Sequence, residues 1–115
     1  MSSKIYHNPR CGKSRQALQL LQERGERPEV IEYLKQPPSR EELERILALL
    51  GLEPRGLMRH KEPEYKELNL DDPALSRDQL IQAMLDHPKL IERPIVLKDG
   101  KAALGRPPEK ILEVL

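Results

Sequence analysis

The sequence predicts an α/β domain in which a β-α-β half and a β-β-α half flank a helical segment. Three observations predict this order. Short runs of β-branched and aromatic residues alternate with amphipathic stretches of helical length. Proline and glycine mark the breaks between these segments. Near the C-terminus, an Asp99-Gly100 pair separates two short apolar runs, which is a strong β-hairpin signal.

The first half of the chain is predicted to be strand, helix, strand. Residues 4–6 have the pattern of a short strand. Residues 14–24 carry apolar side chains at helical spacing, and Gly25 is suited to end that helix. β-branched and aromatic residues predict a second strand over 28–34, and two prolines at 37–38 then break the chain.

The middle of the chain is predicted to be mostly helical, to about residue 85. Ser39 with Glu42, and Ser76 with Gln79, have the spacing of a capping box at a helix N-terminus. Apolar residues at helical spacing follow both pairs. Two predicted helices therefore begin at these serines.

The last part of the chain is predicted to return to strands. Residues 95–97 and 102–104 should pair with each other across the Asp-Gly turn. Pro107 and Pro108 are predicted to open a final helix. The second half is therefore β-β-α.

This order of elements is the thioredoxin arrangement with a helical insertion between its halves. The 115 residues contain no repeat or linker, so we expect a single domain, residues 1–115, with the insertion over about 37–90. In that fold the reactive cysteine lies between the first strand and the first helix, as Cys11 does. A cis-proline is expected at the start of the third strand, and Pro94 occupies that place.

Composition excludes several classes of function. The formal net charge is +1 and the chain has no Phe or Trp, so we expect no nucleic-acid partner. A single cysteine excludes the disulfide-stabilised secreted families. No apolar stretch has the length of a signal peptide or a membrane span. We therefore expect a cytoplasmic protein without a membrane partner. Separately, we expect a monomer.

Cys11 is predicted to be a reactive thiolate. At the start of a helix, free backbone N–H groups and the helix dipole stabilise a thiolate over a thiol. Arg10, Lys13 and Arg15 add positive charge, and no acidic residue precedes Glu23. Because the flanking residues are polar and basic, this interpretation is favoured over a buried, inert cysteine.

The cysteine loop, HNPRCGKSR over residues 7–15, is similar to the His-Asn-Pro-x-Cys-x-x-Ser-Arg pattern of the glutathione- and glutaredoxin-coupled arsenate reductases. Three arginines have sequence neighbours that resemble those of the family's three anion-binding arginines. They are Arg59 after Leu-Met, Arg93 before Pro and Arg106 before Pro-Pro. The resemblance extends over essentially the whole chain. It implies a thioredoxin-like fold and the reduction of arsenate to arsenite.

The resemblance also implies a role for each of these residues. Cys11 would be the nucleophile, and the three arginines would bind arsenate or a similar oxyanion. Supporting roles would fall to His7, Ser14, Arg15 and Pro94. His7 either lowers the pKa of Cys11 or holds the loop in shape, and the alternative for Ser14 and Arg15 is that they only cap and open the helix.

The resemblance implies no bound cofactor, with glutathione as co-substrate and glutaredoxin as protein partner. Position 14 is Ser where a redox-sensing relative has a second cysteine, so Cys11 has no resolving thiol in this chain. Arg10 and Lys13 replace the small residue and the Thr that the resistance enzymes usually have, and they resemble a chromosomal branch of the family.

Two other function classes remain as alternatives. One is a glutathione-linked thiol oxidoreductase with a different substrate, and the other is a polymerase-binding transcriptional regulator of the same fold. His60 and His87 have no metal-ligand spacing with Cys11, so no metal site is expected. A P-loop is excluded because position 7 is His where the motif requires Gly. The phosphatase-like reductases are excluded because position 17 is Ala where they have Arg.

Overall fold

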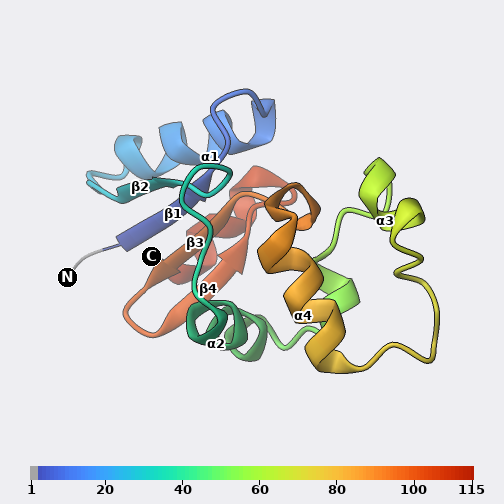
Figure 1. Ribbon diagram of the computed structural model, residues 1–115. Coiled ribbons are helices and arrows are strands. Elements are labelled where there is room, and N and C mark those ends of the chain that lie inside the picture. The colour runs from blue at the N-terminus through green and yellow to red at the C-terminus, as the bar shows by residue number, and fades with distance from the viewer. Residues whose placement is uncertain (1–2) are drawn as a thin grey trace. The chain divides into compact units, whose positions relative to one another are not determined.

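A four-stranded mixed sheet forms the centre of the computed structural model, which describes residues 3–115 (Figure 1). The strand order is β2-β1-β3-β4. β1 pairs with β2 in parallel and with β3 antiparallel, and β4 is antiparallel to β3. The strands are β1 (Ser3–His7), β2 (Glu29–Glu32), β3 (Ile95–Lys98) and β4 (Lys101–Leu104). The predicted α/β order is confirmed.

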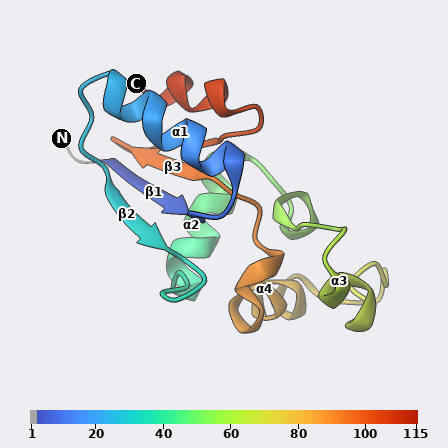
Figure 2. The ribbon, with the colours of Figure 1, turned by 90° about the horizontal axis from the view of Figure 1, so that it is seen from above.

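Helix α1 (Gly12–Glu23) connects the parallel strands β1 and β2. In Figure 2 it lies beside the C-terminal helix η3 (Pro108–Val114), above the strands. Side chains from these two helices and from the strands pack into one buried apolar cluster. Its members are Ile5, Ala17, Leu21, Val96, Ala103, Ile111 and Val114. Because α1 is anchored by this cluster, the position of its N-terminus at the end of β1 is fixed.

The β3–β4 hairpin has the turn that its sequence predicts. Asp99 and Gly100 have positive φ angles of 51° and 75°. A type I′ turn requires left-handed backbone at both central positions, which Gly adopts freely and Asp tolerates. The register pairs Ile95 with Leu104 and Lys98 with Lys101.

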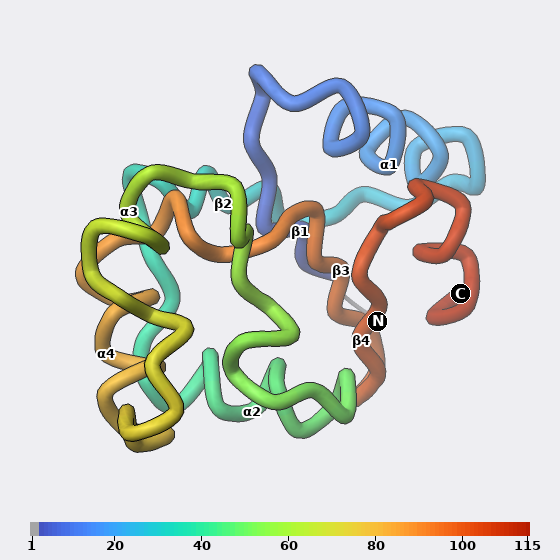
Figure 3. Tube along the Cα trace, turned by 90° about the vertical axis from the view of Figure 1, so that its right-hand side faces the viewer, coloured from blue at the N-terminus to red at the C-terminus, as the bar shows by residue number. Residues whose placement is uncertain are grey.

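The chain divides into two compact units. The first comprises residues 1–36 and 93–115, and the second is Pro37–Glu92. Figure 3 traces the chain out of the first unit after β2 and back into it at β3.

The second unit is built of short helices around buried apolar side chains, among them Leu43, Ile46, Ile81 and Met84. These side chains recur at helical spacing in the sequence, which is the pattern that predicted the helices. The helices are α2 (Arg40–Leu50), η1 (Pro54–Leu57), α3 (Pro63–Glu67), α4 (Arg77–Asp86) and η2 (Pro88–Leu90).

One of the two predicted capping boxes is complete. At Ser76 the side chain accepts from the Gln79 N–H, and the Gln79 side chain accepts from the Ser76 N–H at 2.8 Å. At Ser39 the side chain accepts from the Glu42 N–H at 3.1 Å, but Glu42 Oε1 is buried without a hydrogen-bond partner. The prediction of a full box at Ser39 is therefore wrong, although its serine still caps α2.

The final helix also differs from the prediction. It is a 3₁₀ helix, η3, with Pro107 at its N-cap and Pro108 at its first position. Its N-cap and its first residue are both prolines, which lack a backbone N–H. Ile111 and Val114 still reach the core, so the segment covers the sheet as an α-helix would.

Candidate active site at the start of helix α1

Cys11 is the N-cap residue of α1 and has extended backbone, with φ −94° and ψ 122°. Its N–H donates to the Asn8 carbonyl at 3.0 Å, and its carbonyl accepts from the Arg15 N–H at 3.0 Å. The side chain is partly exposed. The thiol therefore lies at the positive end of the helix and remains open to a reactant.

The surroundings of Cys11 favour its thiolate. Burial raises the pKa of the thiol, but the backbone N–H of Ser14 and the side chain of Arg93 donate hydrogen bonds to the sulfur. The Arg93 charge and the Lys13 N–H act in the same direction, and together these groups hold the pKa of Cys11 below its usual range. The cation that acts most on the sulfur is therefore Arg93, which is distant in sequence, rather than a neighbour within the loop.

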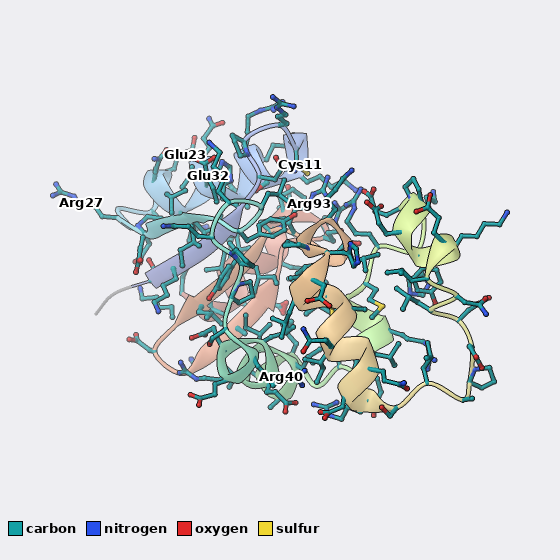
Figure 4. The ribbon with its side chains drawn as sticks, in the orientation of Figure 1. Cys11, Glu23, Arg27, Glu32, Arg40 and Arg93 are labelled. Atoms are coloured by element: carbon teal, nitrogen blue, oxygen red, sulfur yellow. The ribbon has the colours of Figure 1, made fainter. Side chains whose placement is uncertain are left out.

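Arg106 also approaches the sulfur. Its Nη2 lies 4.0 Å from Cys11 Sγ, and its Nε donates to the Arg93 carbonyl at 2.9 Å. Figure 4 labels Cys11 and Arg93 at the same end of the sheet. Two of the three predicted arginines are thus placed around the predicted nucleophile, and each presents a planar set of donors suited to an oxyanion.

The Arg93–Pro94 peptide bond is cis, as predicted, and the Arg106–Pro107 bond is cis as well. Between them, the Gly105 N–H donates to the Pro94 carbonyl at 2.8 Å. A Cβ atom on Gly105 would lie 2.6 Å from Pro94 Cγ, so only glycine allows this approach. The packing of Gly105 against Pro94 thus fixes the backbone positions of the neighbouring residues Arg93 and Arg106.

Tyr33 also belongs to this site, although its sequence context predicts only a strand. It is buried directly after β2. Burial lowers the pKa of Arg93, but Tyr33 and Cys11 both raise it, so the pKa of Arg93 is raised overall. The place of Tyr33 in the sequence was a usable signal for the site, because the carboxyl ends of the parallel strands β1 and β2 meet at one edge of the sheet.

A buried polar cluster supports the loop from below. His7 Nδ1 lies 2.7 Å from Ser14 Oγ, which also accepts from the Asn8 N–H at 3.1 Å. His7 is 6% exposed and Ser14 is fully buried. Burial lowers the pKa of His7, Glu32 opposes this and Arg15 adds to it, so the ring is neutral near pH 7. His7 holds Ser14, whose backbone N–H donates to Cys11.

Arg15 has a structural contact in the loop. Its Nη1 donates to the Pro9 carbonyl at 2.9 Å, which ties the first turn of α1 to the segment before Cys11. The contacts of His7 are those of loop support. The expectation that Ser14 and Arg15 cap the helix is wrong, because Cys11 is the N-cap residue of α1 and both residues lie inside it.

Arg59 lies in the second unit and is held by two carboxylates. Its Nε donates to Glu62 Oε1 at 3.1 Å and its Nη1 to Glu92 Oε1 at 2.9 Å. The Arg59 side chain is 23% exposed, and its backbone N–H donates to the Leu90 carbonyl at 2.7 Å. The side chain is therefore well ordered within its unit, and its contact with an oxyanion stays a prediction.

Among residues 3–115, no three His, Cys, Asp or Glu side chains gather closely enough to hold a metal ion. No helix in the same range is long and apolar enough to cross a membrane.

Comparison with known proteins agrees with the site geometry. The model of the ArsC family matches residues 6–114. The chain belongs to the ArsC family. This assignment confirms the resemblance that the cysteine loop and the three arginines carry, and with it the thioredoxin-like fold.

The ArsC relatives cover the chain almost from end to end. An arsenate reductase of Neisseria meningitidis is 58% identical over 97% of this chain and 97% of its own length. A protein of Escherichia coli named YfgD, whose name assigns no activity, is also 58% identical, over 97% of this chain and 95% of its own. The solved arsenate reductase of Vibrio cholerae has a TM-score of 0.97 and 59% identity, covering 100% of this chain and 98% of its own.

Proposed function

We propose that this ArsC-family chain reduces arsenate to arsenite, with glutathione and glutaredoxin as electron donors. The observation that carries the proposal is the placement of Arg93 and Arg106 around a Cys11 sulfur whose pKa is lowered. The same geometry offers a nucleophile and, within reach of it, the donors that an oxyanion requires. The arsenate reductases among the relatives support arsenate as that oxyanion.

The first step is attack of the Cys11 thiolate on arsenic. One S–As bond forms and one As–O bond breaks, and the leaving oxygen takes protons and departs as water. Arg93 and Arg106 hold the remaining oxygens and offset the negative charge that gathers on them. Arsenic is still As(V) in this adduct.

The second step transfers two electrons. A glutathione thiol attacks the adduct, an S–S bond forms between glutathione and Cys11, and the electrons of the S–As bond stay on arsenic. The thiol proton passes to an arsenite oxygen, and As(III) leaves. The products are arsenite and a mixed disulfide of Cys11 with glutathione.

Regeneration requires an external thiol, because Cys11 is the only cysteine in the sequence. We propose that a glutaredoxin thiolate attacks the glutathione sulfur, which returns Cys11 as the thiolate and leaves glutathione on glutaredoxin. This cycle needs a compartment in which thiols stay reduced, and we therefore place the protein in the cytoplasm.

The direct test is a coupled assay with arsenate, glutathione, glutaredoxin and the reductase that recycles glutathione. We expect arsenite to form with wild-type protein over many turnovers, and none above background with Cys11→Ser. Thioredoxin alone should support little turnover, because it supplies no small thiol for the second step.

Sustained turnover with thioredoxin and no small thiol would contradict the proposed donors. A protein with reactive Cys11 that forms no arsenite with either donor system would contradict the proposed substrate. That result would favour a thiol oxidoreductase of another substrate or a polymerase-binding protein.

A further inference from the structure

A cavity of about 330 Å³ lies beside the cysteine loop, within the first unit. Its walls are residues 7–10 of the loop and Glu32, Leu34 and Lys35 at the end of β2. It therefore opens where the carboxyl ends of the parallel strands β1 and β2 meet, the edge at which α/β sheets commonly bind ligands. The volume is at the lower end of the range for small-molecule sites.

The walls of this cavity carry two cations and one acid. Arg10 is exposed, and the Lys35 side chain is 80% exposed. Glu32 is half-exposed and lies 3.7 Å from the Lys35 ammonium. An ion pair between such exposed groups is weak, so a ligand can replace it at little cost. Pro9 and Leu34, both exposed, add apolar surface between the charges.

We propose that this cavity binds the small thiol that reacts at Cys11, and that the thiol is a peptide with two carboxylates and one ammonium group. Such a ligand complements the two cations and the one carboxylate of the walls, and its middle part would cover Pro9 and Leu34. The inference rests on the proposed function, because it names the binding site of the thiol that the second step requires.

The cavity adjoins Cys11 along the loop, although Cys11 is not one of its lining residues. Arg10 lines it and is bonded to Cys11, and consecutive Cα atoms are about 3.8 Å apart. A tripeptide spans about 10 Å when extended, so in the proposed binding mode its central sulfur would lie at Cys11 and its terminal groups would contact Arg10 and Lys35.

The test uses the reaction of Cys11 with glutathione disulfide, without arsenate. In this exchange the Cys11 thiolate attacks one sulfur of the disulfide, a mixed disulfide forms on Cys11, and one glutathione thiolate leaves. The rate is compared with that of the neutral bis(2-hydroxyethyl) disulfide. The ratio of the two rates measures recognition of the charged peptide and cancels any change in the reactivity of Cys11.

The variant is Lys35→Glu, which reverses a charge on the cavity wall without touching the cysteine loop. We expect the ratio to fall about fivefold, since one attraction is lost and one repulsion is added between exposed groups. The matched control is Lys101→Glu on β4, at the opposite edge of the sheet and outside the cavity. This control should leave the ratio unchanged.

An unchanged ratio in Lys35→Glu, or an equal fall in Lys101→Glu, would overturn the proposed site. Because the assay contains no arsenate, its outcome is independent of the coupled assay above. The rate ratio could fall in Lys35→Glu alone while the wild-type protein does not reduce arsenate. That result would support the thiol site and contradict arsenate as the substrate.

Discussion

At Cys11, backbone and side-chain donors act on one sulfur against the cost of burying its charge. The Ser14 and Lys13 N–H groups belong to the first turn of α1, whereas Arg93 lies in the segment before β3. The helix donors are a consequence of the N-cap position and would be present in any sequence that begins a helix there. The arginine is specific to this fold, because only the return of the chain at β3 brings it to the loop.

The buried side chain of His7 should make the stability of the protein depend on pH. Burial lowers its pKa in the folded protein, so between that lowered pKa and about 6.5 the unfolded chain binds a proton that the folded protein does not. The free energy of unfolding contributed by His7 is therefore complete above pH 6.5 and falls as the pH drops below it. We expect urea denaturation to show lower stability at about pH 5.5 than at about pH 7.5.

The comparison with His7→Gln isolates this effect, since the other titratable groups are common to both proteins. The variant should lose less stability than wild type over the same pH interval. An equal loss in both proteins would show that protonation of His7 is not the cause.

At the scale of elements, Arg93 and Arg106 of the candidate site lie in the segments just before and just after the β3–β4 hairpin. Gly105 follows β4 and packs against Pro94, which precedes β3. Arg93 and Arg106 are the residues next to this pair in the sequence. The hairpin therefore closes at the backbone of these two arginines, which are the proposed anion ligands, and its packing sets their spacing.

Gly105→Ala should destabilise the protein by about 1–3 kcal/mol, the usual cost of extra volume in a well-packed position. The added Cβ would lie 2.6 Å from Pro94 Cγ and 3.2 Å from Ile111 Cγ2. Denaturant unfolding measures the change. Gly12→Ala is the control, because its Cβ would meet only Arg15 Nη2 at 3.8 Å and Ala favours a helix. Equal stability of Gly105→Ala and wild type would refute the close packing.

Elements with local signals could be predicted from the sequence. The Asp99-Gly100 turn, the Ser76 cap and helix α1 depend on residues within a few positions of each other, and all three are found. The box at Ser39 is incomplete although its spacing is correct, because the rotamer of Glu42 is not a property of the local sequence.

The site required more than local signals. Arg106 and Cys11 are 95 residues apart in sequence, so their contact follows from the whole sheet and was expected only through the family resemblance. The place of Tyr33 after β2 is a signal that assigns it to the edge where β1 and β2 end, whereas the cavity depends on how side chains of the loop and of β2 pack and has no sequence signal.

At the scale of the whole molecule, the chain is a thioredoxin-like unit interrupted by the helical unit Pro37–Glu92. The first unit contains Cys11, Arg93, Arg106 and the cavity beside the loop. The proposed nucleophile, the proposed anion ligands and the proposed thiol site thus all lie in one unit, so the proposed sulfur chemistry depends on that unit's own packing. The reactivity of Cys11 is accordingly the property on which the whole account depends.

The most direct test is the rate of Cys11 alkylation by iodoacetamide as a function of pH. Wild-type protein should show a midpoint below the free-thiol value of about 8.5, since the helix donors and Arg93 stabilise the thiolate. In Arg93→Ala the midpoint should move up toward that value. A wild-type midpoint at or above about 8.5, or a midpoint that does not move in Arg93→Ala, would contradict the account.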